Sequence, residues 1–276
     1  MAFSAQFSKT GGIGQPALHM PKSDGHKYHR GHAFVISGPR HRTGAARLAA
    51  CAALRTGAGL VTIIGNADAL NEHAAHVTAI MLREEDAQFR VIGGRTNAVA
   101  IGPAAGVNDE TCTRVLRLLA LGMPTVLDAD AMTSFEGTPD RLFSALHHKA
   151  VLTPHEGEFR RLFPDIDLAD RADAVRQAAR RANAIVLLKG PETQIASPQG
   201  RWAINRNASP WLATAGSGDV LTGIVTGLLA QQSPAFEAAA MAAWLHGEIA
   251  KRSGAGLTAD DMPGLIPSVL RDLPLA

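Results

Sequence analysis

Short apolar runs alternate with longer segments of helical spacing along most of this chain. The runs occupy residues 33–36, 60–64, 98–101, 124–127, 150–152 and 185–188. Runs of this length, bounded by Gly, Pro or polar residues, are typical of strands buried on both faces. The intervening and following segments with helical spacing cover residues 43–56, 110–120, 156–162, 168–181, 219–231, 235–251 and 265–273. This alternation predicts an α/β fold whose central, mostly parallel sheet is covered by helices on both faces.

The pattern changes after the last of these runs. Residues 193–196 and 202–205 flank the turn-forming sequence Ser197-Pro-Gln-Gly-Arg201, which predicts a β-hairpin. No internal repeat, low-complexity tract or interdomain linker is visible. We therefore expect a single domain over residues 27–276. The polar, Gly- and Pro-punctuated residues 1–26 precede it as an N-terminal extension, either a flexible arm or a cover for a sheet edge.

Composition excludes some classes of function. Hydrophobic residues make up 46% of the chain, enough for a large core, and the formal net charge is +2. This balance predicts neither a nucleic-acid nor a membrane partner. No segment has the length of a membrane span, and the first residues lack the apolar centre of a signal peptide. Cys51 reads as a core residue and Cys112 as an ordinary helix residue. Two separated cysteines suggest neither a zinc site nor a disulfide framework, so a cytoplasmic location is expected.

The sequence Gly216-Ser217-Gly218-Asp219 carries the most informative chemistry. It leads directly into the apolar helical pattern from residue 220 to 229. Backbone N–H groups at a helix start bind anions, and glycine lets a phosphate approach the backbone closely. Asp219 fits a general base that deprotonates a hydroxyl as a phosphoryl group arrives. The alternative is a plain Gly-rich loop in which the helix dipole favours a first-turn Asp. The spacing matches neither a P-loop nor a dinucleotide fingerprint.

Other strand ends also carry polar or Gly-rich sequences. They are Gly38–Ala45, Gly102–Gly106, Asp128–Asp130, Thr153–Glu158 and Lys189-Gly190. Ligands of open α/β sheets bind outside the carboxyl ends of the strands, so these sequences are expected to meet at one site.

These motifs together resemble the ADP/ATP-dependent NAD(P)H-hydrate dehydratase family of the ribokinase-like superfamily. The resemblance extends from about residue 27 to about residue 252. Its most specific part combines Leu152-Thr-Pro-His-Glu-Gly-Glu158 with the loop from Gly216 to Asp219. Further matching segments are Lys27–Gly31, Thr43–Ala45, Ala53–Thr62, Ile101–Gly106, Leu127–Ala131, Leu188–Gly190 and His246-Gly247. The resemblance implies a ribokinase-like three-layer sandwich.

The resemblance also implies roles for individual residues. Asp219 is the implied catalytic base. The residues implied to bind the hydrated dinucleotide are Ala45, Gly106, His155 and Asp219. Those implied to bind the adenine nucleotide are Lys189, Gly190, Pro191, Glu192, Thr193, Gly216, Ser217 and Gly218. Direct metal ligands are unknown, and Glu158 is implied only as a contact to Mg²⁺ through water. The chain departs from the family at Pro191 and Glu192, where many relatives have a small residue, and at Ala104, which replaces a glycine.

The residues themselves leave structural alternatives open. His155 could be a surface residue at a helix start, and Glu158 could cap that helix. Lys189 could be a salt-bridged lysine at a strand end. Asp128 and Asp130 could be a strand-end aspartate and a helix cap, and we expect this pair to support the site rather than to contact substrate.

The implied activity is repair of a nicotinamide cofactor. It is the ADP-dependent dehydration of (6S)-NADHX and (6S)-NADPHX to NADH and NADPH, with Mg²⁺ as cofactor, ADP as co-substrate, and AMP and phosphate as products. ADP is the expected donor because the chain resembles the stand-alone bacterial form, and a homo-oligomer is expected. One alternative is a ribokinase-superfamily kinase that phosphorylates a vitamin-like alcohol; it shares Asp219 but does not explain Thr153–Glu158. Another is a non-catalytic nucleotide-binding module, against which an intact candidate base argues.

Overall fold

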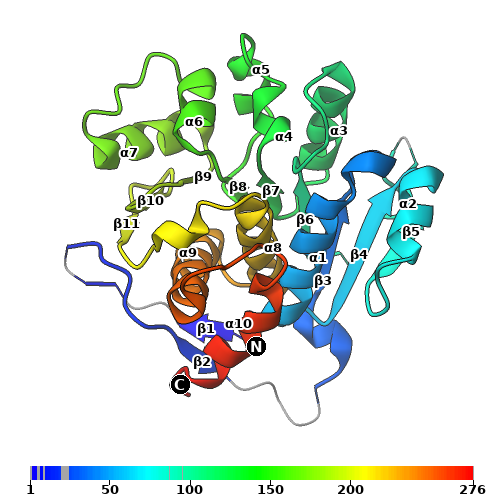
Figure 1. The fold of residues 1–276 in the computed structure, drawn as a ribbon. Helices are drawn as coiled ribbons and strands as arrows, with labels where there is room; N and C mark the ends of the chain where they lie inside the picture. The colour runs from blue at the N-terminus through cyan, green and yellow to red at the C-terminus, as the bar shows by residue number, and fades with distance from the viewer. Residues whose placement is uncertain are drawn as a thin grey trace.

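A nine-stranded sheet forms the centre of the molecule (Figure 1). This computed structural model describes residues 2–4, 7–8, 10–19, 25–86, 88–94 and 96–275. The strand order is β11-β10-β9-β8-β7-β6-β3-β4-β5. The strands are β3 (His32–Ile36), β4 (Leu60–Gly65), β5 (Met81–Glu84), β6 (Ala98–Ile101), β7 (Thr125–Leu127), β8 (Ala150–Leu152), β9 (Ile185–Leu188), β10 (Thr193–Ala196) and β11 (Trp202–Asn205). All neighbours from β9 to β5 pair in parallel, and the β10–β11 hairpin adds antiparallel pairing at one edge.

Helices cover both faces of this sheet, as the alternation in the sequence predicts. The helices on one face are α1 (Gly44–Thr56), α8 (Ser217–Ala230), α9 (Ala235–Ser253) and α10 (Met262–Arg271). Those on the other side or near the edges are α2 (Ala67–Ala74), α3 (Asp109–Ala120), α4 (Asp130–Thr133), α5 (Pro139–Phe143), α6 (Glu156–Leu162) and α7 (Arg171–Ala182). Side chains alternate between two buried clusters along β3: Ala33 and Val35 join one, Phe34 and Ile36 the other. The predicted three-layer α/β arrangement is confirmed.

Helices α1 and α8 touch through their backbones. A Cβ at Gly223 of α8 would lie 2.1 Å from the Ala49 carbonyl oxygen of α1, and one at Gly227 would lie 2.7 Å from that of Ala53. Only glycine fits at so close a crossing. The contact fixes the start of α8 relative to the start of α1, and both starts lie at the carboxyl edge of the sheet.

The predicted elements all form, with ends shifted by a few residues. The pattern did not predict α2, α4, α5 or β5. Strand β5 is half-exposed to exposed, and only its first two residues, Met81 and Leu82, are apolar before Arg83 and Glu84. Both cysteines lie in helices: Cys51 of α1 is half-buried and packs against the core, and Cys112 of α3 is buried, with its Sγ donating to the Ser134 carbonyl at 3.0 Å.

The described part of the N-terminal extension pairs with the outer edge of β11. The Ile204 N–H donates to the Gly11 carbonyl at 2.8 Å, and the Ile13 N–H donates to the Ile204 carbonyl at 3.1 Å. Strands β1 (Ala2–Ser4) and β2 (Ala17–His19) form a separate antiparallel pair. Residues 1, 5, 6, 9 and 20–24 of the predicted extension lie outside the described residues. Within the described ranges, no helix combines the length and apolar character needed to cross a membrane.

Candidate functional site

The Gly-rich loop forms the start of α8. Gly216 caps the helix with φ 89°, and a Cβ there would lie 2.7 Å from Leu48 Cδ1 of α1. The Ser217 hydroxyl donates to the Leu212 carbonyl at 2.8 Å and ties the loop to the preceding turn. The first N–H groups of a helix have no intrahelical partner, so this loop presents donors suited to an anion.

His246 of α9 supports the loop from behind. Its Nε2 lies 2.9 Å from the Ser217 carbonyl oxygen, so this nitrogen carries the proton and donates. Burial lowers the pKa of His246 to about 4, and the ring is therefore neutral near pH 7. His246 belongs to one of the segments that resemble the family, but the resemblance implied no role for it.

Asp219 lies half-buried in the first turn of α8. Burial raises its pKa to about 6; Asp128 and Asp130 also raise it, whereas Lys189 lowers it. Among the described residues, no side chain donates a hydrogen bond to its carboxylate. A carboxylate with a pKa near neutrality and free oxygens can accept a proton from a bound hydroxyl.

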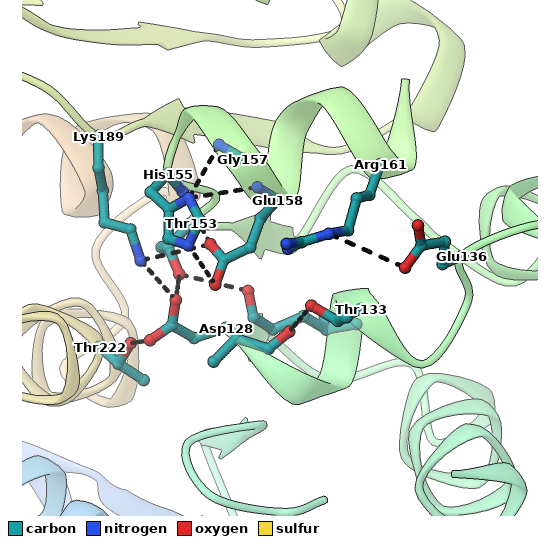
Figure 2. A network of polar contacts seen from close by, with 12 residues as sticks. Asp128, Thr133, Glu136, Thr153, His155, Gly157, Glu158, Arg161, Lys189 and Thr222 are labelled. Atoms are coloured by element: carbon teal, nitrogen blue, oxygen red, sulfur yellow. Dashed lines mark hydrogen bonds and ion pairs between the residues drawn. The ribbon is translucent and has the colours of Figure 1, made fainter. Parts of the chain in front are cut away.

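Asp128 is the centre of a polar network that joins three strand ends to α8 (Figure 2). Its Oδ1 accepts from the Thr153 hydroxyl at 2.8 Å and from Lys189 Nζ at 2.9 Å. Its Oδ2 accepts from the Thr222 hydroxyl at 2.9 Å. The residue is 2% exposed. The strand ends therefore meet as expected, with Asp128 between them. The sequence did not predict the hydrogen bonds from Thr153 and Thr222 to Asp128.

His155 and Glu158 cap α6, as expected if His155 lies at a helix start and Glu158 caps that helix. His155 Nδ1 accepts from the N–H groups of Gly157 and Glu158 at 2.9 and 3.2 Å. Glu158 Oε2 accepts from the His155 N–H at 2.8 Å and completes a capping box. The His155 side chain remains 55% exposed, with Nε2 3.4 Å from Glu158 Oε1. One ring nitrogen is thus engaged in the cap, and the other faces the buried Glu158 carboxylate.

The segment expected to bind nucleotide divides into two parts. The Lys189 ammonium turns inward to Asp128 and lies 3.7 Å from Glu158 Oε2. The next residues form a turn in which the Thr193 hydroxyl donates to the Gly190 carbonyl at 3.1 Å. Pro191 and Glu192 are exposed on this turn. The Arg171 guanidinium donates to the Lys189 carbonyl at 3.1 Å, and the Arg206 guanidinium donates to Glu192 at 2.9 Å; both hold the turn.

The loops after β3 and β6 close the opposite side of the site. A Cβ at Gly38 would lie 2.1 Å from the Ala104 carbonyl oxygen, so the two loops touch. The Gly106 N–H donates to Asp130 Oδ2 at 2.8 Å. Ala104 adopts φ 57°, a left-handed conformation that costs a non-glycine residue about 1–2 kcal/mol. Ala104 thus holds a backbone shape that glycine adopts more readily.

Ala45 lies near the Gly-rich loop. It is the second residue of α1 and shares a helix face with Leu48 three residues later, which contacts the loop at Gly216. Four residues assigned by resemblance therefore lie on elements that meet at the Gly-rich loop. They are Ala45 on α1, Lys189 after β9, and Gly218 and Asp219 on α8.

A metal cage of side chains is not present in the described ranges, where no cluster of three or more His, Cys, Asp or Glu residues could hold an ion. The oxygens of Asp128 already accept from Thr153, Thr222 and Lys189, and Glu158 Oε2 accepts from the α6 cap. Mg²⁺ usually keeps water and takes one or two carboxylates plus substrate phosphates. The residues present fit a Mg²⁺ that arrives with a nucleotide.

Comparison with known proteins gives one consistent result. The profile of the Carb_kinase family, described as NAD(P)H-hydrate dehydratase, matches residues 33–266. The chain is 40% identical over 238 residues to the bifunctional NAD(P)H-hydrate repair enzyme Nnr of Synechocystis sp., which covers 81% of this chain and 44% of that protein. The chain spans about half the length of the curated relatives it matches.

Solved structures agree with this result. The ADP/ATP-dependent NAD(P)H-hydrate dehydratase from Bacillus subtilis, co-crystallised with ATP and Mg²⁺, superposes with a TM-score of 0.80 at 26% identity, over 92% of this chain and 94% of that one. A ribokinase-like superfamily protein from Enterococcus faecalis superposes with a TM-score of 0.82 at 23% identity, over 94% and 93% of the two chains. The second similarity concerns the fold alone, and it confirms the ribokinase-like architecture.

Proposed function

The chain belongs to the NAD(P)H-hydrate dehydratase family, and from that premise we propose that it dehydrates (6S)-NADHX and (6S)-NADPHX with ADP as co-substrate. NADH or NADPH, AMP and phosphate are the products. One observation carries the proposal: the Asp219 carboxylate, with a pKa of about 6, lies beside the N–H groups at the start of α8. A base and an anion site are thus adjacent.

The proposed reaction is a transfer step followed by an elimination: Asp219 and the α8 loop serve the transfer, and the dehydratase family favours the elimination. Asp219 accepts the proton of the substrate hydroxyl while that oxygen attacks the terminal phosphoryl group of ADP, and the bond from this phosphorus to the bridging oxygen breaks to release AMP. The backbone donors of Gly218 and its neighbours stabilise the charge that develops. The lone pair of the ring nitrogen then expels phosphate from the neighbouring carbon. Loss of a proton from the next carbon restores the double bond.

The two substrates are proposed to lie on opposite sides of Asp219. The proposed contacts of the hydrated dinucleotide are Ala45, Gly106 and the His155 side chain, which is 55% exposed. The proposed contact of ADP is the turn from Gly190 to Thr193, in which Pro191 and Glu192 are exposed, together with residues 216–218. The first group lies on the loops and helix starts that follow β3, β6 and β8. The second follows β9 and begins α8.

Magnesium is proposed to arrive with the nucleotide. Glu158 would meet its hydration shell, and the ion would neutralise phosphate charge during transfer. The Bacillus subtilis relative was co-crystallised with ATP and Mg²⁺ and is described as ADP/ATP-dependent. For this chain we propose ADP as the preferred donor, a cytoplasmic location and a homo-oligomeric state. Light scattering on the purified protein measures that state.

The test is a reaction with hydrated NADH, Mg²⁺ and either ADP or ATP. Recovery of NADH absorbance, with free phosphate and AMP accumulating in phosphorus NMR, is the expected result. A stable phosphorylated alcohol would instead identify a kinase, because a kinase leaves the phosphate on its product. Activity with ATP while ADP is inert would contradict the donor preference alone.

A further inference from the structure

Lys189 lies where a positive charge is ordinarily unfavourable. A Cβ at Gly218, in the first turn of α8, would lie 3.6 Å from Lys189 Nζ. The start of a helix carries partial positive charge, so an ammonium there needs compensation. Asp128 and Glu158 supply it, at 2.9 and 3.7 Å. The Lys189 side chain is 21% exposed, and that of Asp128 is 3% exposed.

Asp128 is built to hold this ammonium. Besides Lys189, it accepts from the hydroxyls of Thr153 and Thr222, so its charge is fully hydrogen-bonded inside the protein. A buried carboxylate so near Asp219 would by itself oppose ionisation of Asp219, and Asp130 acts in the same direction. Lys189 is the group that opposes both.

We propose that Lys189, anchored by Asp128, is the internal counter-ion that keeps Asp219 able to ionise near neutral pH, and that its ammonium does not bind the nucleotide phosphates. The inference rests on the proposed function because it takes Asp219 as the base. Lys189 acts through Asp219 and is therefore a positioning residue. ADP is then held by the exposed turn after Lys189 and by the backbone of the α8 loop.

The charged groups that face the start of α8 come from several elements. Asp128 follows β7, Asp130 begins α4, Glu158 lies in α6, and Lys189 follows β9. His246 of α9, neutral and bonded to Ser217, adds no charge. Among these described groups Lys189 is the one cation, so its removal leaves like charges around Asp219. Removal of the Asp128 charge has the opposite effect.

The first experiment compares Lys189→Met with wild type in two measurements. The acid limb of the kcat profile, which follows protonation of Asp219, should move to higher pH by about one unit or more. The ADP dissociation constant, measured by calorimetry, should stay unchanged. If the ammonium binds phosphate instead, the acid limb stays in place and ADP binding weakens about tenfold or more, as loss of a charge-assisted hydrogen bond does. That result would overturn the proposal.

Lys149→Met is the matched control. Lys149 directly precedes β8, at the amino edge of the sheet, and is exposed. The substitution removes the same charge from the far edge, so neither the acid limb nor ADP binding should change. A shift equal to that of Lys189→Met would show an effect of net charge alone and would contradict a local counter-ion.

A second pair of variants covers the event that Lys189→Met does not fold. Asp128→Asn should move the acid limb to lower pH. The double variant Asp128→Asn/Lys189→Met removes both members of the closest ion pair, and its acid limb should return close to that of wild type because two opposite effects are removed together. An acid limb in the double variant displaced as far as that of either single variant would overturn the proposal.

A titration without substrate separates this inference from the proposed function. Carboxyl-carbon NMR of protein labelled at aspartate, with Asp219→Asn used to assign the resonance, reports the pKa of Asp219 directly. A pKa that rises in Lys189→Met supports the counter-ion even if no dehydration is found. A pKa that does not move overturns it even if dehydration is found.

Discussion

Asp219 opposes folding at the pH where it serves the proposed chemistry. Its pKa is raised on folding from 3.8 to about 6, chiefly by burial. A carboxyl with a raised pKa binds its proton more tightly in the folded chain. Below about pH 4 the group is protonated in both states and costs no stability. As the pH rises through about 6, ionisation of the buried carboxyl destabilises the folded chain.

We expect Asp219→Asn to raise the free energy of unfolding by about 1–2 kcal/mol at pH 8, after allowance for solvent screening, and to leave it unchanged near pH 4. At pH 8, where the wild-type Asp219 is ionised, turnover should fall about 10²–10⁴-fold. Urea unfolding at the two pH values checks the first statement. Asp260→Asn, at an exposed position, is the control and should change neither quantity. Equal stabilisation at pH 4 and pH 8 would contradict the assigned cause.

His155 combines a cap with a proposed substrate contact, and two substitutions separate them. His155→Ala removes the acceptor for the Gly157 and Glu158 N–H groups and should cost about 1 kcal/mol of stability. Asparagine is a good cap, so His155→Asn should keep that stability. Both variants should raise KM for the hydrated dinucleotide while ADP affinity stays constant. A wild-type KM in the Asn variant would show that His155 only caps α6 and does not contact the substrate.

Helix packing sets the sensitivity of the glycine positions. Gly223→Ala would place a Cβ 2.1 Å from the Ala49 carbonyl oxygen and should lower the free energy of unfolding by about 1–3 kcal/mol. Gly264 of α10 meets no atom within 4 Å of its built Cβ, so Gly264→Ala should instead raise stability by about 0.5–1 kcal/mol. Thermal unfolding of the two variants measures this difference. A Gly223→Ala protein as stable as wild type would show that α1 and α8 can separate.

Most helices and strands could be predicted from the sequence. Each buried parallel strand leaves a local apolar run, which can be recognised without knowing which strands it pairs with. Strand β5, half of which is charged and exposed, was not predicted. The contacts of the candidate site are of another kind. Lys189 and Asp128 lie 61 residues apart, and Thr222 and Asp128 lie 94 apart. No local pattern indicates that these side chains meet; only the parallel order of β7, β8 and β9 brings their ends together.

The whole molecule has one sheet edge that its own N-terminal residues cover. Gly11 and Ile13 pair with Ile204, and the Phe7 ring lies 5.6 Å from that of Phe236. An uncovered edge strand presents unpaired N–H and C=O groups to other chains. We expect deletion of residues 1–13 to cause self-association beyond the wild-type state, measured by light scattering over a concentration series. An unchanged mass at every concentration would show that β11 is protected in another way.

The close crossing of α1 and α8 has a consequence for how this chain can evolve. Glycine is the smallest residue, so every codon change that replaces Gly223 or Gly227 adds carbon to a contact without room for it. Pro191 and Glu192 are exposed and can drift. Single substitutions at these two exposed residues are therefore the expected route to a changed preference for the phosphate donor. The helix crossing that positions Asp219 would stay unchanged.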